Sequence, residues 1–310
     1  MTQALTLNDS IHKRILGWID ERFPLPNAVL FFILYLLSAV VARATHNGES
    51  SLVLFDIVSC LVTWLLFLLV RIFDEHKDYE LDVLNHPKRV LQSGLVTLNN
   101  LKVLGVISIV SQVLISLYLD AFSFGAVTFS WAIMFVYLCL MGVEFFCGEW
   151  LEERLTLYAF SHMLLMPITV YWLANLAVPG IELNTPLILT MLLSFVSGFC
   201  FEITRKTRGP EEERETVDSY SKIFGTKGSA FVIILLLSGM LFLQILLLLS
   251  LDVSIVWIYV IASSAMFVYS LKFILTFIRY PTLAAREKNE TAIGLNLLVG
   301  YLIVIIATFI

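Results

Sequence analysis

The sequence predicts an all-α protein, a polytopic membrane helix bundle arranged around a central cavity. Its 310 residues are 59% hydrophobic and only 15% charged, whereas about a quarter of the residues in soluble domains are charged. The mean hydropathy is +0.88, and the apolar residues form continuous runs long enough to cross a bilayer as helices. Continuous runs also exclude a transmembrane β-barrel, whose strands alternate apolar and polar residues.

The apolar runs predict about nine membrane-spanning helices. Charged residues, or turn residues such as Pro179 and Gly180, separate the runs. The predicted spans cover residues 27–44, 51–73, 103–120, 125–146, 157–177, 185–202, 229–250, 254–278 and 291–309. Before the first span, Ile11, Ile15 and Ile19 stand at helical spacing among charged residues, which predicts an amphipathic helix lying on the membrane surface.

We therefore expect an interfacial segment over residues 1–26 and a single transmembrane domain over residues 27–310. One long polar loop follows the second span and another follows the sixth. This repeated plan divides the domain into two halves, about 27–146 and 157–278, and a last helix at 291–309. Such a plan predicts a functional site between the halves.

Basic residues set the expected orientation. Lys and Arg precede span one and follow spans two, four, six and eight, and only Arg43 falls in a predicted loop on the other side. By the positive-inside rule, the N-terminus and both long polar loops face the cytosol, and the C-terminus lies on the opposite side. We expect a multi-pass protein of the cell (inner) membrane whose active face is cytosolic.

The first long polar loop opens with a dense acidic segment, formed by Asp74, Glu75, Asp78, Glu80 and Asp82. In a continuous helix, Asp74, Asp78 and Asp82 stand at i, i+4 and i+8, so their carboxylates share roughly one face and repel one another. Oxygen ligands of this kind favour Mg²⁺, which often bridges a few carboxylates to a phosphorylated substrate. The alternative is a solvated charged loop.

The second long polar loop is basic where it leaves the sixth span. If the span continues as a helix, Glu202 faces Arg205 at i+3 and Lys206 at i+4, and Gly209 and Pro210 end the helix. Lys and Arg side chains at this place suit an anionic group. Alone, the segment is also explained by the positive-inside rule; facing a carboxylate cluster, it predicts a site for a diphosphate and a metal ion.

A third polar group lies at the junction of spans four and five. Glu144 stands between Val143 and Phe145, and an ionisable residue within a span is a candidate functional residue by default. The alternative for Glu144 is a hydrogen bond to a neighbouring helix. His162 is either a general base or diphosphate donor, or a histidine that packs between helices.

Several other chemistries lack their motifs. The sequence contains no GxxxxGK[ST] loop, no GxGxxG between a strand and a helix, no HExxH and no GxSxG. These absences disfavour nucleotide hydrolysis, dinucleotide redox chemistry and the corresponding hydrolase reactions. The four cysteines lack ligand-like spacing, which argues against a zinc site and a disulfide framework.

The acidic segment resembles the first signature of the UbiA superfamily of intramembrane prenyltransferases, NDxxDxxxD. Residues 74–82, DEHKDYELD, supply acids at the family's acidic positions and Asp74 where Asn is usual. Residues 86–94, HPKRVLQSG, are similar to the HPxRPLxxG-like stretch that often follows, with Val90 in place of the second proline. The fit in topology covers nearly the whole chain.

The second loop resembles the family's second signature less closely. Glu202 falls where its first Asp is expected, and residues 217–225, VDSYSKIFG, resemble its usual tail. Arg205 and Lys206 replace the later acids of that signature. The resemblance is that of a divergent member, in which basic residues of this loop take over electrostatic work.

The resemblance implies an intramembrane prenyltransferase that ionises a polyprenyl diphosphate with Mg²⁺ and transfers the prenyl group to a lipophilic or aromatic acceptor. The implied metal ligands are Asp74, Glu75, Asp78, Asp82 and Glu202. The implied catalytic residues are Glu75, Asp78 and Asp82. The predicted substrate-binding residues are Arg89, Tyr158, His162, Arg205 and Lys206, together with Glu144, an extra acid that has no place in the family pattern. The expected partners are the prenyl diphosphate, the acceptor and membrane lipid, and no nucleic acid.

Two alternatives stay open. A terpene cyclase built on the same fold would use an internal double bond, not an acceptor, to capture the allylic cation. A permease or lipid-binding protein would keep the scaffold without catalysis. The sequence leaves the acceptor, the prenyl chain length, the number of Mg²⁺ ions and the oligomeric state undetermined.

Overall fold

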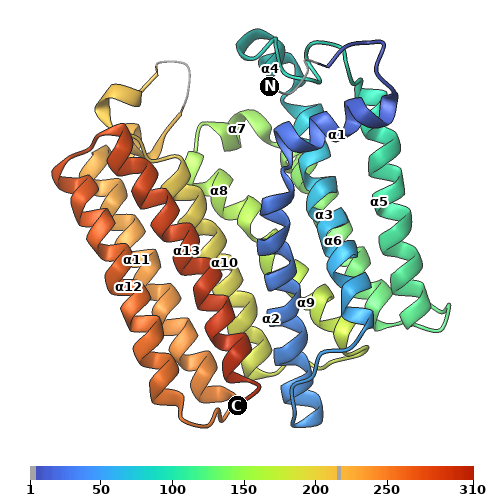
Figure 1. Ribbon diagram of the computed structural model, residues 1–310, viewed down its shortest axis with the longest axis vertical. Coiled ribbons are helices and arrows are strands. Elements are labelled where there is room, and N and C mark those ends of the chain that lie inside the picture. The colour runs from blue at the N-terminus through green and yellow to red at the C-terminus, as the bar shows by residue number, and fades with distance from the viewer. Residues whose placement is uncertain (1–4, 215–217) are drawn as a thin grey trace.

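The computed structural model is a bundle of long, roughly parallel helices (Figure 1). It describes residues 5–214 and 218–310, and within these ranges every regular element is a helix. Eight helical stretches of the described residues are long and apolar enough to cross a membrane, and the shorter apolar helix α6 (Ala126–Gly142) lies among them in the chain. These elements correspond to the predicted spans, and the all-α membrane architecture is confirmed.

Helix α1 (Ile11–Arg22) lies in the segment predicted to be interfacial. It is followed by α2 (Ala28–Asn47), α3 (Phe55–Lys77), α4 (Tyr79–Asn85), α5 (Leu98–Leu119) and α6. The later elements are α7 (Gly148–Glu152), α8 (Leu155–Met163), α9 (Leu165–Ala177), α10 (Thr185–Arg205), α11 (Tyr220–Ser250), α12 (Val256–Arg279) and α13 (Leu283–Ala307). Short 3₁₀ turns lie at Leu25–Asn27 (η1), Glu144–Phe146 (η2) and Pro210–Glu212 (η3).

Proline and glycine explain two departures from uninterrupted spans. The predicted span 157–177 consists of α8 and α9, because Pro167 in the first turn of α9 has no N–H to donate to the carbonyl of Met163, the last residue of α8. Helix α11 starts well before the predicted residue 229, but Gly225 interrupts it with a φ of +68°. Its first turn therefore belongs to the polar loop.

Both long polar loops lie at one end of the bundle. Figure 1 shows α1, α4, α7 and the segment after α10 at this end, close to the N-terminus, and the C-terminus at the opposite end. This end of the bundle is called the polar end below. Its placement in the cytosol remains a prediction from the basic residues.

A buried ion pair ties α2 to α3 at the opposite end. Arg43, which the sequence places in a loop, belongs to α2 and is only 5% exposed. It donates hydrogen bonds of 2.8 and 2.6 Å to the carboxylate of Asp56, which also accepts one of 2.6 Å from Tyr35. Because each charge is paired and hydrogen-bonded, the pair is tolerated between the helices.

Helix α1 packs on the bundle through its apolar face. The Trp18 side chain has no exposed surface and belongs to a cluster that includes Leu68 of α3 and Leu91 of the following loop. Arg14 donates a hydrogen bond of 2.9 Å to the carbonyl of Leu95. The segment predicted to be interfacial thus covers the loop that carries the acidic segment.

Candidate functional site

The acidic segment is broken at Asp78. Helix α3 ends at Lys77 and α4 begins at Tyr79, so Asp78 is the junction between two helices. A continuous helix would have placed Asp74, Asp78 and Asp82 on one face. The structure instead divides the acids into a group paired with arginines and a group without such partners.

Glu75 and Asp82 form the paired group. The Glu75 side chain has no exposed surface, and its Oε1 accepts hydrogen bonds from Arg22 at 2.6 Å and from Arg71 at 3.0 Å. Asp82 accepts a hydrogen bond of 2.8 Å from Arg89 and lies 3.5 Å from Arg22. Three guanidinium groups therefore neutralise two of the predicted metal ligands.

Asp74 and Asp78 form the second group. Asp74 is 46% exposed, and its ion pair with Arg71 is long, at 3.9 Å; Asp78 forms no ion pair with any residue that the structure describes. Partial burial raises the pKa of Asp78 against the effect of Lys77, and the charge of Asp82 raises it further. Neither carboxylate is neutralised by a close ion pair, so a bound cation would stabilise the charged form of both.

The available oxygens fit a metal ion shared with a substrate. Among residues 5–214 and 218–310, no three His, Cys, Asp or Glu side chains are grouped closely enough to hold a metal ion. Mg²⁺ is commonly held by one or two carboxylates together with substrate phosphates and water. Asp74 and Asp78 provide two such carboxylates, and Oε2 of Glu75 is a buried acceptor without a partner.

The basic end of α10 faces this acidic segment. Glu202 pairs with Arg205 at 2.7 Å and with Lys206 at 2.9 Å, in the i+3 and i+4 relation that the sequence predicts. The guanidinium of Arg205 lies within electrostatic range of the Asp74 carboxylate. The structure therefore brings the two polar loops together. The Glu202 carboxylate, a predicted metal ligand, is paired with its two basic neighbours.

Tyr158 lies between the two loops. The ammonium groups of Lys77 and Lys206 lie 4.8 and 5.6 Å from the centre of its ring, and Lys77 also donates a hydrogen bond to its hydroxyl. His162 stacks on the same ring, with 4.0 Å between ring centres. Lys77 further pairs with Glu144 at 2.5 Å. The third polar group of the sequence thus joins the other two.

The sequence does not predict three residues of this site. Arg71 and Lys77 indicate only the orientation of the chain, although the place of Lys77 directly before Asp78, inside an acidic run, is a signal. Arg22 falls in the predicted interfacial helix, and nothing near it in the sequence indicates that it reaches Glu75. Of the second signature's tail, Val217 lies outside the described residues.

Aromatic side chains continue from the polar residues toward the interior of the bundle. Phe199 and Phe195 precede Glu202 by three and seven residues, so all three share one face of α10. The ring of Phe160 in α8 lies 5.1 Å from that of Phe195 and 6.3 Å from that of Phe199. This face of α10 offers charge at its end and aromatic rings deeper in the bundle.

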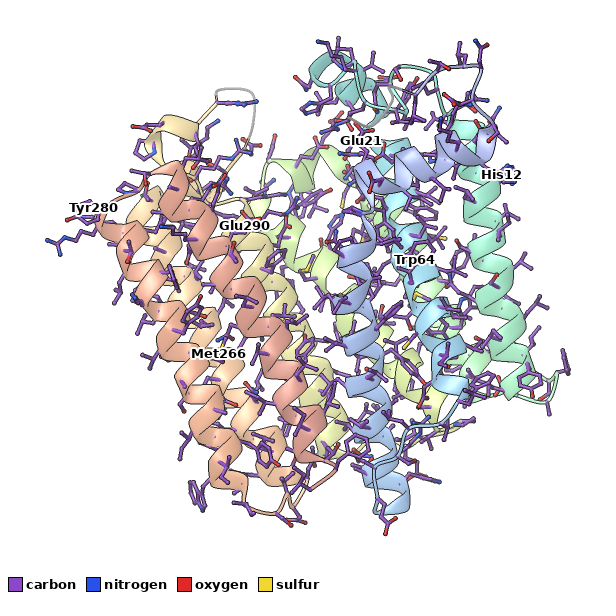
Figure 2. The ribbon with its side chains drawn as sticks, viewed as in Figure 1. His12, Glu21, Trp64, Met266, Tyr280 and Glu290 are labelled. Carbon is purple, nitrogen blue, oxygen red and sulfur yellow. The ribbon has the colours of Figure 1, made fainter. Side chains whose placement is uncertain are left out.

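An open hollow lies beside the basic end of α10. Its volume is about 680 Å³, and it is lined by Phe201, Arg286, Glu287, Glu290, Thr291 and Gly294. Glu290 interacts with the charge of Arg205, and Figure 2 shows it toward the same end of the bundle as Glu21 of α1. The site therefore has open space next to it on the side of α13.

Comparisons with known proteins agree with this architecture. The model of the UbiA prenyltransferase family matches residues 29–296. A solved structure described as digeranylgeranylglyceryl phosphate synthase in membranes is similar, with a TM-score of 0.66 and 17% identity over 96% of this chain and 99% of that one. The apo structure of a UbiA homolog from Aeropyrum pernix K1 has a TM-score of 0.60 and 12% identity over 88% and 98%. No curated protein sequence matches the chain.

Proposed function

The chain belongs to the UbiA prenyltransferase family, and from this premise we propose that it transfers the prenyl group of a polyprenyl diphosphate to an acceptor within the membrane. The observation that carries the proposal is the meeting of the two polar loops, with acids from α3, bases from the end of α10 and Tyr158 between them. A diphosphate site needs both acids and bases. The acids bind a metal ion that neutralises only part of the diphosphate's negative charge, and the bases neutralise the rest.

Each group of side chains has a role in the proposal. Arg205 and Lys206 neutralise the diphosphate, and the Tyr158 hydroxyl donates a hydrogen bond to it. Asp74 and Asp78 would hold Mg²⁺, which when bound stabilises negative charge developing on the leaving group. Glu75, Asp82 and Arg89 keep the acidic segment in position through their ion pairs, and His162 holds the Tyr158 ring through stacking.

The proposed reaction breaks the bond between C1 of the prenyl chain and the diphosphate oxygen. The bonding electrons leave with the diphosphate, whose developing charge the basic side chains stabilise. The resulting allylic cation lies among aromatic faces such as Phe160, Phe195 and Phe199, which attract cations. An electron pair of the acceptor then forms the new bond to C1, and the acceptor's proton passes to the released diphosphate.

Product analysis tests the proposal. Purified protein is incubated with Mg²⁺ and geranyl, farnesyl or geranylgeranyl diphosphate, with and without a panel of lipophilic and aromatic acceptors. We expect diphosphate release and a prenylated product only when an acceptor is present. A hydrocarbon or terpene alcohol formed without an acceptor would instead establish a cyclase.

The matched variants are Asp78→Asn, which removes a charge from the site, and Lys102→Met, which removes one from the exposed side of α5. Asp78→Asn should lower turnover at least about a hundredfold with an unchanged melting temperature, and Lys102→Met should change neither. Diphosphate release by the wild type that does not exceed that of Asp78→Asn would support a non-catalytic scaffold.

A further inference from the structure

We propose that Lys77 binds the departing diphosphate together with Lys206, and that Glu144 is the partner of the Lys77 ammonium that the diphosphate displaces. This inference rests on the proposed prenyl transfer and specifies which side chains of that site bind the diphosphate leaving group. Lys77 occupies one of the unspecified positions of the NDxxDxxxD signature, so the signature does not assign it a role.

Two cations converge on one aromatic ring. Lys77 comes from the end of α3 and Lys206 from the end of α10, yet their ammonium groups lie 4.8 and 5.6 Å from the centre of the Tyr158 ring. The two ammonium groups are therefore no more than about 10 Å apart, and like charges at such distances repel each other. A compact anion bound next to both would reduce that repulsion, and each ammonium has three N–H donors, not all of which its present partners use.

Each lysine has its own carboxylate partner. Glu202 pairs with Lys206 at 2.9 Å, and Glu144 pairs with Lys77 at 2.5 Å. The Glu144 side chain is only 14% exposed, so the pair is shielded from solvent. A diphosphate carries more negative charge than a carboxylate, so it can take over the Lys77 ammonium from Glu144.

A strained turn positions Glu144 beside Lys77. Glu144, Phe145 and Phe146 have φ angles of +50°, +55° and +59°, a region that side-chain-bearing residues rarely adopt. Such strain persists only where the surroundings hold it, and it clusters at functional sites. Phe145 is held by ring contacts with Tyr137 and His162, at 5.5 and 6.1 Å.

Gly148 completes the arrangement. A Cβ atom built on Gly148 would lie 2.2 Å from Oε2 of Glu144. The missing side chain therefore leaves the space that the Glu144 carboxylate occupies beside Lys77. Gly148→Ala should push this flexible carboxylate away from Lys77, and its effect on anion binding should resemble that of Glu144→Gln.

The test measures binding of inorganic pyrophosphate to the purified full-length protein by calorimetry, in detergent without added metal. Lys77→Met should weaken binding about tenfold, the effect of losing one charge-assisted contact, and Lys77→Arg should keep most of the affinity. Glu144→Gln and Gly148→Ala should tighten binding several-fold, since the competing carboxylate is removed or displaced. Lys102→Met, the matched control, should not change it.

Pyrophosphate affinity should fall in Lys77→Met and rise in Glu144→Gln, and a purely structural ion pair would not produce these opposite changes. Unchanged pyrophosphate affinity in folded Lys77→Met, or weaker binding in Glu144→Gln, would overturn it. If Lys77→Met does not fold, Glu144→Gln alone decides, and unchanged affinity there also counts against the inference. Prenyl transfer by the wild type together with a negative binding result would defeat only this inference, whereas Lys77-dependent binding without any diphosphate release would defeat the proposed function.

Discussion

Arginine partners give four neighbouring acids different chemical characters. Glu75 and Asp82 are paired with guanidinium groups, while Asp74 and Asp78 lack close basic partners and are therefore available to a cation. The separation depends on Arg22, because this residue reaches both Glu75 and Asp82 from α1. Residues that hold ligands in place commonly affect activity as strongly as some of the ligands themselves.

We therefore expect Arg22→Gln to lower kcat about tenfold. The unpaired Glu75 carboxylate would repel Asp78 and compete for the cation, so the Mg²⁺ concentration needed for half-maximal activity should change as well. Arg22→Lys should restore part of the loss. The control is Arg14→Gln, because Arg14 lies on the same helix but binds only a backbone carbonyl. Wild-type kinetics in Arg22→Gln would show that the pairing has no role.

A second prediction concerns the buried ion pair between Arg43 and Asp56. Arg43→Ala leaves the Asp56 carboxylate buried without its counter-ion and should lower the free energy of unfolding by about 3–5 kcal/mol. The double variant Arg43→Ala with Asp56→Ala should lose less than the sum of the two single changes, because neither charge is then unpaired. Denaturation in detergent measures this. Additive losses would contradict the coupling, and kcat should stay unchanged because the pair lies at the far end of the bundle.

Among the elements, α6 shows how a short span is started. Its N-terminal N–H groups would be unsatisfied, but the Asp120 carboxylate accepts hydrogen bonds from Gly125 at 3.1 Å, Val127 at 3.2 Å and Thr128 at 2.7 Å. Desolvation opposes ionisation, yet these hydrogen bonds outweigh it and hold the pKa of Asp120 below its usual range. The charged cap therefore stabilises the helix.

Asp120→Ala should accordingly lower stability by about 1–2 kcal/mol at neutral pH. Because the folded pKa is depressed, the contribution is complete above the unfolded pKa of about 4 and disappears as the pH falls through the lower folded value. The difference between wild type and variant should therefore shrink on acidification. Glu182→Ala, which changes an exposed acid in the loop before α10, serves as the control for loss of charge. A difference that grows at low pH would contradict this account.

At the scale of the whole molecule, function depends on both polar loops facing the same compartment. Basic residues concentrate at this end, which the positive-inside rule assigns to the cytosol. In a Cys147→Ser background, Ser93→Cys should react with a membrane-impermeant maleimide only from the cytosolic side. Ser123→Cys, in the turn between α5 and α6, should react only from the other side. Labelling of both from one side would refute the arrangement of spans.

The sequence by itself determined the bundle, its spans and the two polar loops. Hydropathy and span length are local properties, because a helix must satisfy its own backbone in a membrane whatever its neighbours are. Helix ends followed equally local signals, such as Pro167 and Gly225. The acidic and basic segments were visible for the same reason, since the residues of each lie within a few turns of one another.

Only the tertiary structure decided which charges meet. Arg22 and Glu75 are 53 residues apart, and Lys77 and Tyr158 are 81 apart. No pattern within a window of a few helical turns specifies such pairs, since they depend on how α1, α3 and α8 pack. The energy of a charge depends on its partner and its burial. For that reason, the roles of Glu75, Lys77 and Glu144 follow from the fold and not from the residue types alone.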